Sequence, residues 1–487
     1  MKKLYILLAV GESVMMSACS DFLDRDPMTT PNSETFLSNA SAVNNYINGL
    51  YIALPSFGTY DMGVRGEEKN SDNIVAEVYD KRLNGELLET GGGTAEWQNG
   101  YQNLRNVNYF FEYYKVPEAE ETKDVLSLKG EAYFFRAYWH FYLLTRFGSI
   151  PVMDKFWDGN ATVAGLQIPP RDRSAVAQFI IDDLKTAKNL LYSRSQYKGL
   201  RICKEAAIIM AMRVALYEGT WEKYHKGTGR VPGDATWPGK RIHTDFSTNM
   251  DNEINFFLDE AMKAAEQVAD DITLTNNTGL TNPKNISGIV GWNPYFEMFA
   301  EEDMSSYSEV LFWKQYMNGG GVSITHGTPA YIFTGGNNGM LKSFVDCFVM
   351  KDGLPYYAAG DEYKGDKTIM DVKENRDLRL QMFVLGEKDL LPSSSTEEPA
   401  LKEFKQPNII SLEAQTSDNT GYRIRKCLTY NNKQIISGQS QSTTGCIIFR
   451  GVEAYLNYLE AYYLRNNKVD GKAKSYWDAV RNRAGIT

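Results

Sequence analysis

The sequence has few of the residues on which metal chemistry and nucleophilic catalysis depend. It contains five cysteines and four histidines among 487 residues, and no two cysteines form a CxxC pair. The histidines are scattered, and no HExxH, GxSxG or EF-hand pattern occurs. These absences exclude a zinc site of regular spacing, and the sequence predicts neither a metal nor a cofactor. Whether any cysteines pair is left open, because connectivity cannot be deduced from spacing.

An excess of positive charge is also missing. Lysine and arginine number 52 against 61 aspartates and glutamates, which gives a net charge of −9. Because binding to a phosphate backbone needs a basic face, this balance argues against nucleic acid as a partner. Aromatic residues are abundant instead, at 13% with 30 tyrosines and 8 tryptophans. Such residues suit stacking and interfaces, although many must belong to the core.

One apolar stretch organises the chain, and it is too short to cross a membrane. Few side chains are polar over 132–147, and a helix that is apolar on nearly every side must be enclosed. Arg136 and Arg146 bracket an apolar run shorter than the ~20 residues of a membrane span. Gly148 ends the helix and Pro151 prevents its resumption. We therefore expect the central helix of a soluble, mostly helical core.

Helical periodicity extends over much of the first half. The pattern predicts further helices over 33–54, 97–114, 172–192, 201–224 and 253–270. Within one of them, small residues recur at every fourth position, namely Cys203, Ala207, Ala211, Ala215 and Gly219. A ridge of small side chains lets a second helix approach closely. Serial helix pairs with such a seam are typical of tetratricopeptide-like repeats, here with long insertions.

The amino-acid composition and the periodicity of the sequence change at about residue 271. Asn, Gly, Ser and Thr become frequent and helical periodicity is lost, until it returns over 447–466 and 471–484. We predict a mainly α fold, with a tetratricopeptide-like scaffold of helical pairs and a large, loop-rich inserted lobe that contains short strands. The expected divisions are a signal peptide at 1–18, a helical region at 19–270, the lobe at 271–446, and a returning helical pair at 447–487.

The N-terminus has the pattern of a lipoprotein signal peptide. Lys2 and Lys3 are followed by a short apolar run over 4–10, and then by the sequence MSAC, which ends at Cys19. In this interpretation Cys19 is acylated and becomes the first mature residue, and two acyl chains give stable anchoring. The alternative is a buried N-terminal helix with an incidental cysteine.

Several segments, in order along the chain, carry a family resemblance. They include GEAYFFRAYWHFYLLTRFGSIPVM, SFVDCFVMKDGLPY at 343–356, NRDLRL at 375–380, GYRIRKC at 421–427, VEAYLNYLEAYYLRNN and VRNRAG. Each motif is weak alone, but together they resemble the SusD/RagB family of Bacteroidetes outer-membrane lipoproteins. Family members normally continue beyond the last segment, so the chain is expected to lack a C-terminal part.

The resemblance implies a nutrient-capturing protein on the cell surface, lipid-anchored in the outer membrane. Such proteins form a lid over a SusC-like TonB-dependent transporter, bind oligosaccharides or other nutrients, and are not enzymes. The helical scaffold would then dock on the transporter. The irregular lobe would supply most of the contacts with a glycan ligand.

Candidate ligand residues are the aromatic side chains that lie in polar loops. The C–H face of a sugar packs on an aromatic face, while hydroxyl groups bond to polar side chains. On this basis the candidates are Trp292 and Tyr295 first, Tyr331 and Phe333 second, and Tyr60 with Asp61 and Tyr79 with Arg82 third. The alternative for each is that the ring anchors its loop to the core.

Two other functions remain open. One is a helical-repeat surface protein that binds peptides or proteins and has no sugar site. The other is a surface glycoside hydrolase, which needs two carboxyl groups held apart across a sugar. Glu301, Glu302 and Asp303 are adjacent, and a charged turn is the better interpretation of these three acids.

Overall fold

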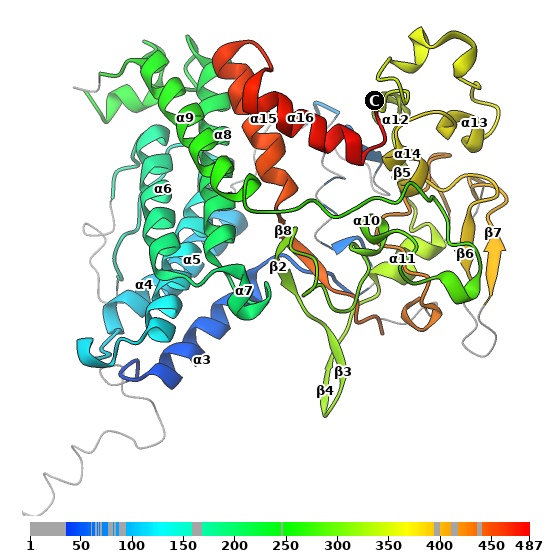
Figure 1. The fold of residues 1–487 in the computed structure, drawn as a ribbon. Coiled ribbons are helices and arrows are strands. Elements are labelled where there is room, and N and C mark those ends of the chain that lie inside the picture. Colours follow the sequence, from blue (N-terminus) through cyan, green and yellow to red (C-terminus); the bar gives the residue numbers. More distant parts are fainter. Residues whose placement is uncertain are drawn as a thin grey trace, which may run out of the picture.

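The protein forms a helical scaffold beside a loop-rich lobe (Figure 1). The computed structural model describes residues 36–59, 61–63, 66, 68, 71–75, 81, 84–86, 94–157, 168–244, 247–393, 400–410, 417–435 and 441–487. The scaffold consists of α3 (Ala40–Leu50), α4 (Thr94–Tyr113), α5 (Lys123–Phe147), α6 (Arg173–Leu190), α7 (Arg194–Tyr197), α8 (Lys204–His225), α9 (Met250–Ala269), α15 (Val452–Asn466) and α16 (Gly471–Arg483).

Helix α5 is the enclosed central helix that the sequence predicts. The Thr122 hydroxyl caps its start, and Gly148, with φ of +70°, ends it. Arg136 donates two hydrogen bonds of 2.7 Å to Asp183, which fixes α5 to α6. The ring of His140 bonds to the Arg136 carbonyl and accepts from a backbone N–H, and burial lowers its pKa to about 3. His140 is therefore a hydrogen-bonded residue of the core.

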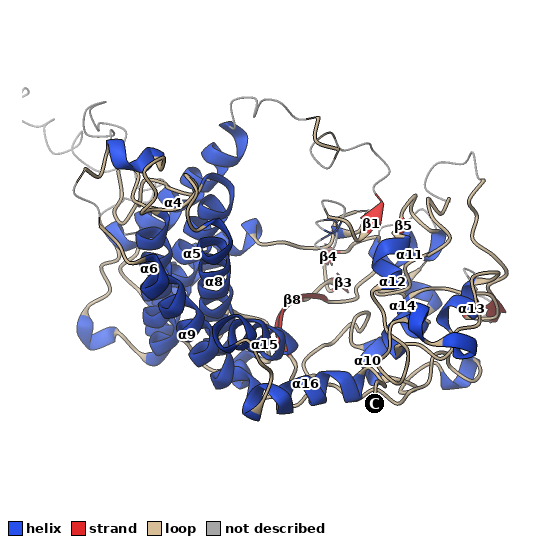
Figure 2. Cartoon of the chain, turned by 90° about the horizontal axis from the view of Figure 1, so that it is seen from above, coloured by secondary structure: helices blue, strands red, loops and turns tan. Residues whose placement is uncertain are grey.

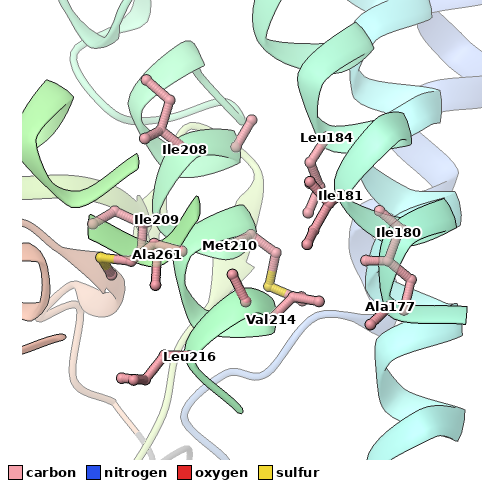
Figure 3. Packing of buried hydrophobic residues seen from close by; sticks show 14 of the residues in the cluster. Ala177, Ile180, Ile181, Leu184, Ile208, Ile209, Met210, Val214, Leu216 and Ala261 are labelled. Carbon is pink, nitrogen blue, oxygen red and sulfur yellow. The ribbon is translucent and has the colours of Figure 1, made fainter. Parts of the chain in front are cut away.

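The seam of small residues lies where helices come close together. Apolar side chains of α6 and α8, including Ile181, Leu184 and Met210, pack in one buried cluster (Figure 3). A Cβ atom added at Gly219 of α8 would lie 3.2 Å from both Phe257 and Leu258 of α9. The small side chains therefore set the distance between α8 and α9, as the four-residue spacing predicts.

Helices α5 and α6 also approach closely, at Gly130, and this contact can be tested. A Cβ atom at Gly130 of α5 would lie 2.9 Å from the Leu190 Cβ and 3.2 Å from the Ala187 carbonyl of α6, whereas Gly49 of α3 has open space. We expect Gly130→Ala to lower the free energy of unfolding by about 1–3 kcal/mol through overpacking. Gly49→Ala should raise it by about 0.5–1 kcal/mol through helix propensity. Urea denaturation measures both, and a stabilised Gly130→Ala variant would contradict this packing.

The lobe is built from loops, short helices and short strand pairs. Viewed from above, its helices lie across from the scaffold, and α16 extends between the two (Figure 2). The lobe helices are α10 (Pro294–Glu297), α11 (Thr328–Thr334), α12 (Lys342–Asp346), α13 (Ile369–Lys373) and α14 (Leu378–Phe383). Its strands are β1 (Ile74–Val75), β3 (Met317–Gly319), β4 (Val322–Ile324), β5 (Gly339–Met340), β6 (Leu390–Pro392) and β7 (Leu401–Glu403). They pair antiparallel as β1–β5, β3–β4 and β6–β7.

One strand pair lies between scaffold and lobe. Strand β2 (Val310–Lys314) pairs antiparallel with β8 (Cys446–Arg450), and the register shifts along the pair. Next to it, the buried carboxylate of Glu309 accepts hydrogen bonds from Arg450, from Arg483 of α16 and from the Thr275 backbone. Strand, helix and loop are thereby joined at one charged centre.

The mainly α fold class with an inserted, strand-containing lobe is confirmed. The predicted helix over 447–466 is wrong at its start, because 446–450 form β8. The sequence CIIFR is rich in apolar and β-branched residues and pairs with a buried strand, which favours extended backbone. The described part of the predicted 33–54 helix begins at Ala40, where the Asn39 side chain caps it. The exact domain boundaries stay a prediction.

Two further observations concern the described residues alone. Their helices include no segment that combines the length and apolar character of a membrane span. Their four cysteines, at 203, 347, 427 and 446, are free.

Candidate functional site

The two leading candidates, Trp292 and Tyr295, are buried. Their side chains are 6% and 4% exposed, respectively. Asn293 does form a turn and caps α10, but the turn itself lies inside the lobe. The Arg483 guanidinium lies 4.4 Å from the centre of the Tyr295 ring. The premise that these two rings face solvent is therefore wrong, because the loop packs them into the second core.

The second pair of candidates, Tyr331 and Phe333, also packs into the lobe. Tyr331, in α11, is 4% exposed, and its hydroxyl donates to the Gly336 carbonyl. Phe333 is half-buried against the same core. The glycine-rich loop therefore uses its aromatic rings as anchors, which corrects the expectation that they are displayed to a ligand.

Of the remaining candidates, Asp61 can be located. It is exposed, and its carboxylate accepts a hydrogen bond of 2.7 Å from the Gly63 backbone. The predicted residues Tyr60, Tyr79 and Arg82, together with the lipidation residue Cys19, lie outside the described residues. Their assigned roles stay predictions.

The structure places a cavity directly beside the leading candidates. It has a volume of about 200 Å³ and lies where α10 and the loop after it meet residues 428–434. Phe296 and Tyr430 line it, and Trp292 packs on both rings, at centroid distances of 4.9 and 5.9 Å. Trp292 is thus a support behind the cavity wall.

Acidic and amide groups complete the cavity wall. Glu301, Asn431 and Gln434 line it together with Glu297. The Glu297 carboxylate accepts hydrogen bonds of 3.0 Å from the backbone N–H groups of Gly291 and Trp292, which fixes the loop before α10.

Glu301 has a carboxyl group that titrates near neutral pH. Burial, the largest cause, and the charges of Glu297, Glu302 and Asp303 together raise its pKa to about 7. The amide oxygen of Gln434 accepts a hydrogen bond of 2.7 Å from the Thr443 backbone, which holds this side chain in place. The cavity therefore combines two aromatic rings with amide and carboxyl groups, a set suited to hydroxyl-rich molecules.

The sequence reasoning missed Glu301, Asn431 and Gln434. Glu301 was interpreted as part of a charged turn, and residues 431–434 carry no motif. The one signal available was the polar run that follows Tyr430. In the described part of the chain, no group of three or more acidic, histidine or cysteine residues could hold a metal ion.

Comparison with protein families defines the class of the protein. A model described as starch-binding and associating with the outer membrane matches residues 21–216, and a model of the SusD family matches residues 308–487. The chain therefore belongs to the SusD/RagB family.

Individual relatives agree with this assignment. SusD-like protein P2 of Formosa agariphila is 24% identical over 266 residues, which make up 52% of this chain and 50% of the relative. The chain thus spans about half the length of the curated relative it matches.

Solved structures share the fold. A SusD-like protein from Bacteroides fragilis matches with a TM-score of 0.67 and 22% identity, covering 95% of this chain and 82% of that one. A SusD-like carbohydrate binding protein from the same species matches at 0.65 and 16%, covering 93% and 80%. A structure with xylogluco-oligosaccharide matches at 0.55 and 17%, covering 93% and 75%.

Proposed function

We propose that this protein binds oligosaccharides at the cell surface and delivers them to a SusC-like TonB-dependent outer-membrane transporter. Membership of the SusD/RagB family supports the proposal. A neighbour of the same fold whose structure contains xylogluco-oligosaccharide supports the ligand class. In this proposal the protein binds its cargo without converting it, and the transporter carries the cargo inward.

The observation that carries the proposal is the cavity beside α10. Phe296 and Tyr430, which are 2% and 4% exposed, form its inner wall, and the groups that it offers to the hydroxyls of a sugar are the amides of Asn431 and Gln434 and the carboxyl of Glu301. Such a mixture of apolar walls and a few placed polar groups is typical of small-molecule sites. The cavity replaces the buried rings of Trp292 and Tyr295 as the proposed contact surface.

The proposal also includes a lipid anchor and separate roles for the scaffold and the lobe. Acylation of Cys19 would tether the chain to the outer membrane after removal of residues 1–18. The helical region 19–270 and the pair at 447–487 would face the transporter, and the lobe at 271–446 would hold the ligand. Mass spectrometry of the membrane-extracted protein tests the anchor directly.

The pH dependence of binding provides a sharp test of the cavity. Between pH 6 and 8 the Glu301 carboxyl, with its pKa of about 7, changes from mainly protonated to mainly ionised. An ionised carboxylate accepts stronger hydrogen bonds from hydroxyl groups. We therefore expect the affinity for a neutral xylogluco-oligosaccharide to rise about three- to tenfold over this range. Isothermal titration calorimetry measures the change.

Matched variants separate this effect from general charge effects. Glu301→Gln keeps the shape of the side chain and should remove the pH dependence. Glu403→Gln, which removes an exposed acid from β7, should retain it. Silence across a panel of neutral and acidic glycans would overturn the proposal, and so would release of sugar products, which would identify a hydrolase.

A further inference from the structure

A second and larger cavity lies in the helical scaffold. Its volume is about 480 Å³, within the range of small-molecule sites. It is bounded by the end of α5, the last turns of α8 and the loop that follows α8, residues 226–243. This cavity is separate from the one beside α10, and the two have no lining residue in common.

The loop over this cavity is held in a defined conformation. The His243 ring bonds to the Pro170 carbonyl at 2.9 Å, which ties the loop to the entry of α6. The Trp237 ring stacks on His243 with an interplanar angle of 11°. A Cβ atom at Gly239 would lie 2.1 Å from the Trp237 ring, so this turn requires glycine. The aromatic wall is therefore preformed.

The cavity wall has an excess of positive charge. Arg146, Arg173 and Arg230 line it, and the described residues that line it include no acid. Arg173 is neutralised by a buried ion pair with Glu218 at 2.7 Å. Arg146 and Arg230 are exposed and have no carboxylate partner in the described part of the chain. The Arg146 guanidinium lies 3.6 Å from the centre of the Tyr142 ring and donates to the Tyr142 carbonyl at 3.1 Å, so two arginines without an ion pair line one cavity on a protein whose net charge is −9.

The indole of Trp221 also lines the cavity. The indole nitrogen of Trp221 is buried and has no acceptor among the described residues. One face of this indole lies on the His225 ring at 4.1 Å and the Arg173 guanidinium lies 4.3 Å from its centre, so the ring is fixed. A buried donor without a partner costs free energy unless a ligand or water accepts from it. The guanidinium groups of the wall donate and never accept, so the wall favours an acceptor-rich anion.

We propose that this scaffold cavity binds an acidic sugar unit, whose carboxylate or sulfate group accepts from Arg146 and Arg230. Trp221 and Trp237 form the rigid back of the cavity, because His225 and Arg173 pack on the Trp221 ring and His243 stacks on the Trp237 ring. The proposal rests on the glycan-binding function above and specifies it: the cargo carries negative charge, and the scaffold contributes a second subsite.

The test compares two probes that differ in charge. Isothermal titration calorimetry of the full chain with a galacturonate trisaccharide should show binding that weakens with added salt. The methyl ester of the same trisaccharide should bind about tenfold more weakly, because it lacks the charge-assisted hydrogen bonds. Equal affinity for acid and ester, or no binding of either, would overturn the proposal.

Variants locate the anion. Arg230→Gln and Arg146→Gln should each weaken binding of the acid by about tenfold and leave binding of the ester unchanged. Lys405→Gln removes one exposed positive charge from the lobe and should bind the acid as the wild type does. Both arginines are exposed, so we expect the variants to fold, and an unchanged melting temperature checks this. Charge-dependent binding that survives both arginine changes would place the anion elsewhere.

The outcomes for the two sites are distinguishable. Binding of a neutral xylogluco-oligosaccharide should be unaffected by Arg230→Gln. If the neutral glycan binds and the galacturonate does not, the acidic subsite is wrong and the glycan-binding function stands. If neither a neutral nor an acidic glycan binds, both proposals fail.

Discussion

Glu309→Ala is expected to lower the free energy of unfolding by about 3–5 kcal/mol, because it leaves buried arginine charge without a partner. Glu309 is 0% exposed. Its carboxylate accepts hydrogen bonds of 3.0 Å from Arg450 and of 2.8 Å from Arg483, whose side chain is itself buried to 8% exposure. Chemical denaturation followed by tryptophan fluorescence measures the loss.

The pH dependence of this centre follows from its charges. Burial alone would raise the pKa of Glu309, but Arg450 and Arg483 outweigh it and lower the pKa below the usual value of a glutamate. The stabilisation is therefore present above the pKa of an unfolded glutamate and is lost as the pH falls through the lowered, folded-state value.

A less buried pair supplies the control. Glu453 accepts two hydrogen bonds of 2.7 Å from Arg213 alone, and both side chains are partly exposed. Glu453→Ala should therefore cost about 1 kcal/mol or less. Equal losses in the free energy of unfolding for the two variants would contradict the larger contribution assigned to the buried Glu309.

Asp389→Ala is expected to loosen the lobe and leave the scaffold folded. The carboxylate of Asp389 bonds to the Lys373 ammonium and, at 2.8 Å, to the Gly386 backbone, and the Arg425 guanidinium lies 3.8 Å away. Both cations are almost fully buried. Removing their counter-charge should cost about 3–5 kcal/mol in the stability of the lobe.

Hydrogen exchange gives the readout for this second variant. Amide protection should fall in the lobe around 373–430 and remain in α5, α6 and α8, because local unfolding follows cooperative units. Glu387→Gln, a change at a neighbouring acid that preserves side-chain shape, should leave the protection of the lobe unchanged. Uniform loss of protection across the scaffold would show instead that lobe and scaffold unfold together.

The parts that the sequence predicts well are those that depend on local periodicity. The enclosed helix α5 follows from an apolar pattern with polar residues at few positions, and the α8 seam follows from small residues every fourth position. Helix boundaries agree with the structure to within a few residues for α6 and α9. In each case the pattern itself determines which face is buried.

The candidate site was harder to predict, because the lobe has a core made of loops. Asparagine and proline around Trp292 indicate a turn, and a turn is normally exposed. Here Asn293 is buried, and its amide donates to Asn277 and to the Leu280 carbonyl at 2.8 Å each. Hydrogen bonds between a turn and residues distant in the sequence cannot be predicted from the local sequence.

The scaffold cavity depends on long-range contacts in the same way. The loop 226–243 carries Trp237 and Arg230, but only the contact between His243 and Pro170 brings it over the end of α5. No local motif in this loop assigns a function to it.

The pairing of β2 with β8 brings together the two ends of the polypeptide between them, residues 315–445. Lys314 lies opposite Cys446, so the chain departs and comes back through adjoining positions on one ladder. Foreign segments joined at these two points would meet the same endpoints whatever their length, since closing a longer loop costs little extra entropy.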